Sequence, residues 1–220
     1  MTVRSDMPPR KPSLFIRMLR FILSRVGRVS VNGVEHLAGT RGKIVVCNHV
    51  GWVDPLWMGY AVLPRTLHQM AKKELFENRL SAWFVRSGGG FPVDRGRPSA
   101  ATIKHTIGLL EQGELVLIFP GGTRSQSGVG ARRGAAMIAL HASAEVVPAH
   151  YDGPDRIRFT DLFRRPRIRI TFGTPIVLPA ESEADKAAAI RLTTELEEAM
   201  KALAGPKPED AATPPLRHAA

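Results

Sequence analysis

The 220-residue chain has little of several features that define whole classes of protein. Its one cysteine, Cys47, excludes an internal disulfide framework and fits a reducing compartment. No apolar run approaches the roughly 20 residues needed to span a bilayer. The apolar stretch near the start is interrupted by Arg17, Arg20 and Arg25, which argues against a secretory signal peptide. No G-x-S-x-G motif occurs, so a serine hydrolase is disfavoured.

Acidic residues are also scarce. The chain has 20 Asp and Glu and 31 Lys and Arg, which gives a formal net charge of +11. Such a surface attracts nucleic acid, anionic membranes or phosphorylated small molecules. Aromatic residues make up only 6% of the chain, and we find no zinc-ligand spacing or RNA-binding sheet motif. We therefore rank nucleic acid last of the three partners.

Apolar strand patterns and helical patterns alternate from residue 43 to residue 150, which predicts an α/β fold with a largely parallel central sheet flanked by helices. The expected strands cover residues 28–32, 43–47, 67–71, 115–119, 145–149 and 167–172, and the expected helices cover 13–28, 55–63, 72–85, 99–112, 132–143 and 183–203. Pro148 predicts that its strand lies at a sheet edge or that the strand ends there.

Length and composition indicate one main domain with added terminal elements. We assign residues 1–28 to an N-terminal basic tail and amphipathic helix, and 29–204 to the α/β domain. Residues 205–220 are rich in Pro and Ala, and we expect this tail to be disordered.

The N-terminal helix carries apolar residues on one side and arginines on another, and it allows two interpretations. In the first, the apolar side packs on the protein's own core and the arginines are solvated. In the second, the helix lies in the membrane interface and its arginines contact anionic headgroups, each contributing about 1 kcal/mol. The apolar positions are Leu14, Phe15, Met18, Phe21, Ile22 and Val26.

The most informative stretch runs from Val45 to Pro55, where a buried strand leads into a turn and then into a helix. Asp54-Pro55 is a favourable helix start, because Asp is a preferred N-cap and Pro is tolerated at the first position. His49 lies five residues before Asp54, and a turn at Gly51 can bring the two side chains together. The pair is either an ordinary polar contact or a general base, in which the carboxylate fixes the imidazole tautomer.

Two further segments follow apolar runs and carry arginine. Arg95 comes after Phe91-Pro92-Val93, and arginine suits bidentate phosphate binding, although loop arginines are often only solvated. Residues 115–119 run into a Gly121-Gly122-Thr123-Arg124 segment, which is either a simple turn or an anion-binding loop. Ligands of α/β folds bind beyond the carboxyl ends of the strands, so we expect these segments and His49 to converge.

These motifs resemble the glycerolipid acyltransferases typified by 1-acylglycerol-3-phosphate acyltransferase, the PlsC type. Four blocks match in order. Asn48 to Asp54 resembles the family's N-H-x4-D block, and Gly90 to Arg95 resembles the block that ends in V-D-R. Phe119 to Ser125 resembles F-P-E-G-T-R-S, and Val146 to Ala149 resembles the fourth block.

The resemblance implies transfer of a fatty acyl group to the hydroxyl of a lysophospholipid such as 1-acylglycerol-3-phosphate, in phospholipid biosynthesis at the cytoplasmic face of the membrane. Acyl-CoA or acyl carrier protein would be the co-substrate, with no bound cofactor or metal. His49 would be the general base and Asp54 its orienting partner, in a direct transfer without an acyl-enzyme. The implied substrate-binding residues are Arg95, Gly121, Gly122, Thr123, Arg124, Val147 and Pro148.

One departure from the family pattern bears on the substrate. Gly121 stands where the family has a Glu that is generally assigned to acceptor binding or to arranging the site. Three explanations are open: the acceptor is a lyso-ornithine lipid or another aminolipid, another carboxylate substitutes, or activity is low. An alternative of a different class is a catalytically weak relative that binds anionic lipid or a partner.

Overall fold

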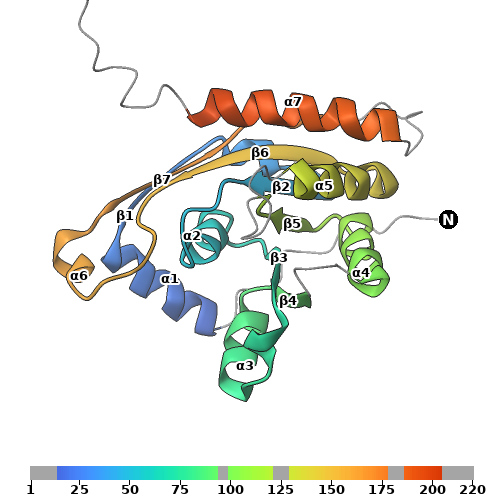
Figure 1. Ribbon diagram of the computed structural model, residues 1–220. Coiled ribbons are helices and arrows are strands. Elements are labelled where there is room, and N and C mark those ends of the chain that lie inside the picture. Colours follow the sequence, from blue (N-terminus) through green and yellow to red (C-terminus); the bar gives the residue numbers. More distant parts are fainter. Residues whose placement is uncertain (1–13, 94–98, 121–128, 178–185, 205–220) are drawn as a thin grey trace, which may run out of the picture.

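The computed structural model describes residues 14–93, 99–120, 129–177 and 186–204 (Figure 1). In these ranges seven strands form one sheet in the order β1-β7-β6-β2-β5-β3-β4. The strands are β1 (Arg28–Asn32), β2 (Lys43–Cys47), β3 (Leu67–Lys72), β4 (Gly90–Val93), β5 (Leu115–Ile118), β6 (Glu145–Asp152) and β7 (Arg167–Phe172). The helices are α1 (Leu14–Val26), α2 (Asp54–Ala61), α3 (Arg79–Ser87), α4 (Ala100–Glu111), α5 (Val129–Ala142), α6 (Asp161–Arg164) and α7 (Lys186–Ala204), with 3-10 helices η1 (Val34–Leu37) and η2 (Lys73–Phe76).

The sheet is largely parallel, as predicted. β2 lies in its interior and pairs in parallel with β5 on one side and β6 on the other. β3 and β4 continue the parallel set beyond β5, whereas β7 pairs with β6 in antiparallel orientation. The carboxyl ends of β2, β3, β4, β5 and β6 therefore meet at one edge of the sheet.

Helices cover both faces of the sheet, which explains why β2 is buried along its length and apolar from Ile44 to Cys47 (Figure 1). Ile44 and Val46 belong to the core cluster formed with α5 and α7. Val45 and Cys47 belong to the cluster formed with α1 and α2 on the other face. A strand buried on both faces has no solvated side, so its sequence shows a continuous apolar run instead of alternation.

The expectation for the strand with Pro148 was wrong, because β6 lies inside the sheet between β2 and β7. Pro148 is tolerated inside the sheet because β7 ends at Phe172, one residue before the position that faces the proline. The Pro148 carbonyl accepts a hydrogen bond from the amide of Gly173 at 2.8 Å, so the proline nitrogen faces this same segment. The ladder with β7 begins at Ala149, which pairs with Phe172, so Pro148 faces a residue beyond the end of β7.

β4 was not predicted, because three glycines and Pro92 obscure its pattern. It pairs with β3 at the sheet edge, where a proline is tolerated. Gly89, just before it, has a φ of 84° and lies so close to the Leu67 carbonyl that a Cβ would stand 2.7 Å from that oxygen. This position therefore needs glycine for its conformation and for its space.

α1 contributes to the core, which agrees with the first of the two interpretations for this segment. Leu23 and Val26 are buried against the cluster that includes α2. Met18, Phe21 and Ile22 are nevertheless exposed. Association of α1 with a membrane stays a prediction.

The remaining expectations for the ends of the chain lie outside the described residues. These are the basic tail at 1–13, the start of the last helix at 183–185 and the tail at 205–220.

The buried and exposed apolar residues of α7 should contribute differently to stability. Leu196 is completely buried against the sheet, whereas Ile190 is 44% exposed. Leu196→Ala should lower the free energy of unfolding by about 2–5 kcal/mol, because it removes buried methyl groups and leaves a cavity. Ile190→Ala on the same helix should change it by about 0.5 kcal/mol or less. Urea denaturation of both variants measures the difference, and equal losses would contradict this packing.

Candidate active site

A histidine and a buried carboxylate form a hydrogen-bonded pair in the turn between β2 and α2. His49 Nδ1 lies 2.9 Å from Asp54 Oδ2. The Asp54 side chain is inaccessible to solvent, and the His49 side chain is 24% exposed. The turn predicted at Gly51 therefore brings the two residues together as expected.

The same carboxylate oxygen is held by the backbone of the turn. The amides of Val50 and Gly51 donate to Asp54 Oδ2 at 2.6 and 2.9 Å. The expectation that Asp54 caps the helix was wrong, because Asp54 is the first residue of α2 and the N-cap residue is Val53. The carboxylate points back into the preceding turn, where the donors converge on Oδ2, and its Oδ1 is buried without a hydrogen-bond partner among the described residues.

This geometry determines which nitrogen of His49 carries the proton in the neutral ring. An ionised carboxylate can only accept hydrogen bonds, so Nδ1 must be the donor to Asp54. Nε2 is then left with a free lone pair, which can take a proton from another group. The pair has the arrangement of a general base with a partner that fixes its tautomer and orientation.

Asn48 joins the ends of β2 and β6 beside this pair. Its side-chain amide donates to the Tyr151 carbonyl at 2.9 Å, and its oxygen accepts from the Tyr151 amide at 2.7 Å. The Tyr151 hydroxyl donates to the Pro154 carbonyl at 2.9 Å. Burial and the nearby charge of Asp54 raise the pKa of the Tyr151 phenol, which keeps it a neutral donor. From the sequence, Asn48 was predicted only as part of the N-H-x4-D block, and Tyr151 was not predicted as a site residue.

Two more contacts define the surroundings of the turn. A Cβ on Gly51 would collide with the backbone of Asp155, so the turn and the segment after β6 are in close contact. The Phe119 ring lies 4.6 Å from the His49 ring, centroid to centroid, with 30° between the planes. The segment that begins with Phe119 and Pro120 therefore starts beside His49.

Five of the other predicted site residues have no described position. Arg95, Gly121, Gly122, Thr123 and Arg124 lie outside the described residues. The structure describes the chain up to Val93 and Pro120, which follow or end strands at the same sheet edge as His49.

Val147 and Pro148 are buried within β6, where they pair with Val45 and Val46 of β2. They precede Tyr151 in β6, and Tyr151 is the residue through which Asn48 joins β6 to the end of β2. Their contact with substrate stays a prediction.

Cys47 is a buried apolar residue, as predicted. Burial, followed by the charge of Asp54, raises the pKa of its thiol well above the ordinary range. The thiol contacts Met58 Sδ at 3.9 Å and faces the core. Within the described ranges, no group of three His, Cys, Asp or Glu side chains is arranged to hold a metal ion.

Fold and site together define an α/β protein with an oriented histidine at the carboxyl edge of a mostly parallel sheet. The model of the acyltransferase family matches residues 28–152 of the chain. The chain therefore belongs to the acyltransferase family, and it is an O-acyltransferase.

Two relatives support this assignment, and one solved structure shares the fold. The 1-acyl-sn-glycerol-3-phosphate acyltransferase of Bacillus subtilis is 42% identical over 158 residues, which cover 72% of this chain and 78% of the relative. The enzyme of the same name from Streptococcus pneumoniae is 39% identical over 155 residues, covering 67% of this chain and 57% of the relative. The crystal structure of the 1-acyl-sn-glycerophosphate acyltransferase of Thermotoga maritima is similar in fold, with a TM-score of 0.61 and 21% identity over 90% of this chain and 80% of that one.

The close contact between Gly51 and the Asp155 backbone can be tested by comparing alanine substitutions at Gly51 and Gly59. Gly51→Ala should lower the free energy of unfolding by about 1–3 kcal/mol, because the added methyl group overlaps the Asp155 backbone. Gly59→Ala in α2 meets nothing within 4 Å and should be neutral or stabilise by up to about 1 kcal/mol. Urea denaturation compares the two variants. A Gly51→Ala protein as stable as Gly59→Ala would show that the turn is not packed against residue 155.

Proposed function

We propose that the chain transfers a fatty acyl group from an acyl thioester to the free hydroxyl of 1-acylglycerol-3-phosphate, with His49 as the general base. The observation that carries the proposal is the 2.9 Å bond between His49 and a fully buried Asp54. The choice of acceptor rests on the names of the relatives from Bacillus subtilis and Streptococcus pneumoniae.

In the proposed reaction, His49 Nε2 removes the proton of the acceptor hydroxyl while the oxygen attacks the thioester carbonyl. The tetrahedral intermediate collapses, the C–S bond breaks, and the imidazolium returns the proton to the departing thiolate. The ester and a free thiol are the products. Asp54 stabilises the imidazolium and keeps Nε2 directed at the reacting group. General base catalysis of this kind contributes typically about 10²–10⁴-fold.

The transfer is proposed to be direct, without an acyl-enzyme. The chain's one thiol is buried, and its raised pKa keeps it protonated and unreactive. His49 is followed by Val50 and Gly51, so its turn offers no hydroxyl nucleophile next to the base. The acceptor hydroxyl itself is then the group that His49 activates.

The phosphate of the acceptor is proposed to bind Arg95 and Arg124, and the backbone of Gly122 and Thr123 to stabilise the phosphate or the oxyanion. A second candidate acceptor follows from Gly121, which replaces a family Glu with a residue that has no side chain. That change favours an aminolipid such as lyso-ornithine lipid, for which the base and its partner would serve unchanged.

The first test is acyl transfer from labelled acyl-CoA and acyl carrier protein to a panel that includes lysophosphatidic acid and lyso-ornithine lipid. His49→Ala should lose about 10²–10⁴-fold in kcat because it removes the base. His141→Ala, an exposed histidine on α5, and Cys47→Ala should retain activity.

The outcomes of this assay separate the candidate functions. Preference for lysophosphatidic acid would support the proposed acceptor, and preference for the aminolipid would support the second. Equal product with His49→Ala would overturn the proposed base. A protein that binds lipid but transfers to no acceptor would be the catalytically weak relative.

We further propose that the enzyme is peripheral at the cytoplasmic face of the membrane and that α1 contacts the lipid. Met18, Phe21 and Ile22 follow the i, i+3, i+4 spacing of one helix stripe, and they are exposed. Arg17 and Arg20 are exposed beside them. In the part of the chain that the structure describes, no helix has the length and apolarity to cross a bilayer. This composition suits a helix that lies in the interface.

Vesicle binding tests the role of α1 by substitution, because deletion of the helix would also remove Leu23 and Val26 from the core. Arg17→Gln/Arg20→Gln should weaken binding to phosphatidylglycerol vesicles roughly 10- to 30-fold, at about 1 kcal/mol for each charge. A variant with the same loss of charge on α5 and α7, Arg133→Gln/Lys201→Gln, is the control. Co-sedimentation at low and high salt measures both, and equal weakening would contradict a specific contact by α1.

A further inference from the structure

α3 carries its three largest apolar side chains on the side away from the protein. Leu80, Trp83 and Phe84 are 74%, 52% and 36% exposed, and their spacing of i, i+3, i+4 places them in one stripe. Ala82, on the opposite side, is buried. The helix is well formed, because the Asn78 side chain caps it by accepting hydrogen bonds from Leu80 and Ser81 amides. A helix that only supported the core would face its apolar stripe inward.

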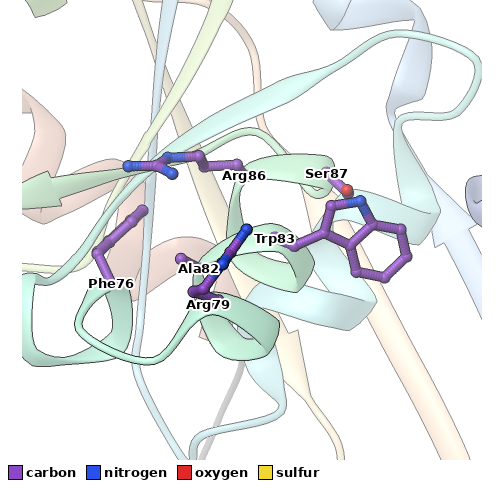
Figure 2. Close-up of a pocket in the computed structure, with 6 residues that line it drawn as sticks. All are labelled: Phe76, Arg79, Ala82, Trp83, Arg86 and Ser87. Carbon is purple, nitrogen blue, oxygen red and sulfur yellow. The ribbon is translucent and has the colours of Figure 1, made fainter.

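Two arginines border this exposed stripe. Arg79 and Arg86, seven residues apart on the same helix, line a cavity of about 450 Å³ together with Trp83 (Figure 2). Phe76, Ala82 and Ser87 complete its lining. The Arg86 guanidinium lies 5.4 Å from the centroid of the Phe76 ring, which holds it at the cavity wall. Guanidinium groups beside aromatic walls are suited to bind the phosphate of an amphiphilic molecule.

We propose that α3 is a second membrane-contact helix. Leu80, Trp83 and Phe84 enter the boundary between headgroups and acyl chains of an anionic bilayer, and Arg79 and Arg86 bind lipid phosphates at the cavity. The charge of the region is complementary to such a surface, since residues 72–86 carry four basic and two acidic side chains. The combination of an exposed apolar stripe, a tryptophan and flanking arginines is that of an interfacial helix.

α1 and α3 lie on the same side of the sheet in Figure 1. Figure 1 places α1 and α3 on the side of the molecule away from α7. α3 packs on η2 and β4 at one edge of the sheet, whereas α1 packs against α2 and α6. The inference extends the membrane association proposed for α1, and contact at two separate helices would also set the orientation of the protein on the bilayer.

A fluorescent label tests whether α3 enters the lipid. In the Cys47→Ala background, Leu80→Cys places an environment-sensitive fluorophore on the exposed stripe, and His141→Cys places it on α5 as a control. With phosphatidylglycerol vesicles, the label at position 80 should shift its emission to the blue and be quenched by spin-labelled lipid. The label at position 141 should do neither. Absence of both effects at position 80 while the protein is vesicle-bound would overturn the proposal.

A charge variant tests the arginines separately from α1. Arg79→Gln/Arg86→Gln should weaken binding to phosphatidylglycerol vesicles roughly 10- to 30-fold, whereas the Arg133→Gln/Lys201→Gln control should not. If only the α1 variant weakens binding, α3 is not a contact and the proposed role of α1 stands. If Arg79→Gln/Arg86→Gln leaves vesicle binding unchanged but raises the KM for acyl-CoA, the cavity binds a soluble phosphate ester and the proposal is overturned.

Discussion

The site depends on a single buried carboxylate oxygen. Asp54 Oδ2 accepts hydrogen bonds from His49 and from two backbone amides of the same turn. A buried carboxylate without such partners would be costly, because the charge is removed from water. The three donors offset that cost and at the same time give the turn its shape. The orientation of His49 is therefore a property of the fold and does not need a bound substrate.

The surrounding architecture holds this turn in place from both neighbouring strands. Asn48 pairs with the Tyr151 backbone at the end of β6, and Phe119 places its ring against His49 at the end of β5. Because β2 lies between these two strands and is buried on both faces, its end cannot shift without disturbing them. The apolar run at 44–47 therefore helps to keep the turn in position.

Much of this arrangement could be predicted from the sequence, for physical reasons that differ between elements. The continuous apolar runs at 44–47 and 115–119 are typical of buried parallel strands, and the pairing of His49 with Asp54 needs only a local turn. The interior position of β6 could not be predicted, because Pro148 is tolerated through the end of β7, which is distant in sequence. Tyr151 and Asp155 were missed for the same reason: their contacts with the turn are made across the sheet.

The His49–Asp54 pair and its hydrogen-bond donors come from one short segment, residues 49–54, and this affects how enzymes of this kind can diversify. Among the described residues, the donors to the carboxylate are residues 49–51, and the segments proposed to bind the acceptor phosphate come from elsewhere in the chain. A substitution in such a segment, as at Gly121, leaves the three residues that donate to the carboxylate unchanged. Under the proposed function, acceptor choice and proton transfer can then be varied separately, provided that an exchanged segment keeps Phe119, whose ring lies against His49.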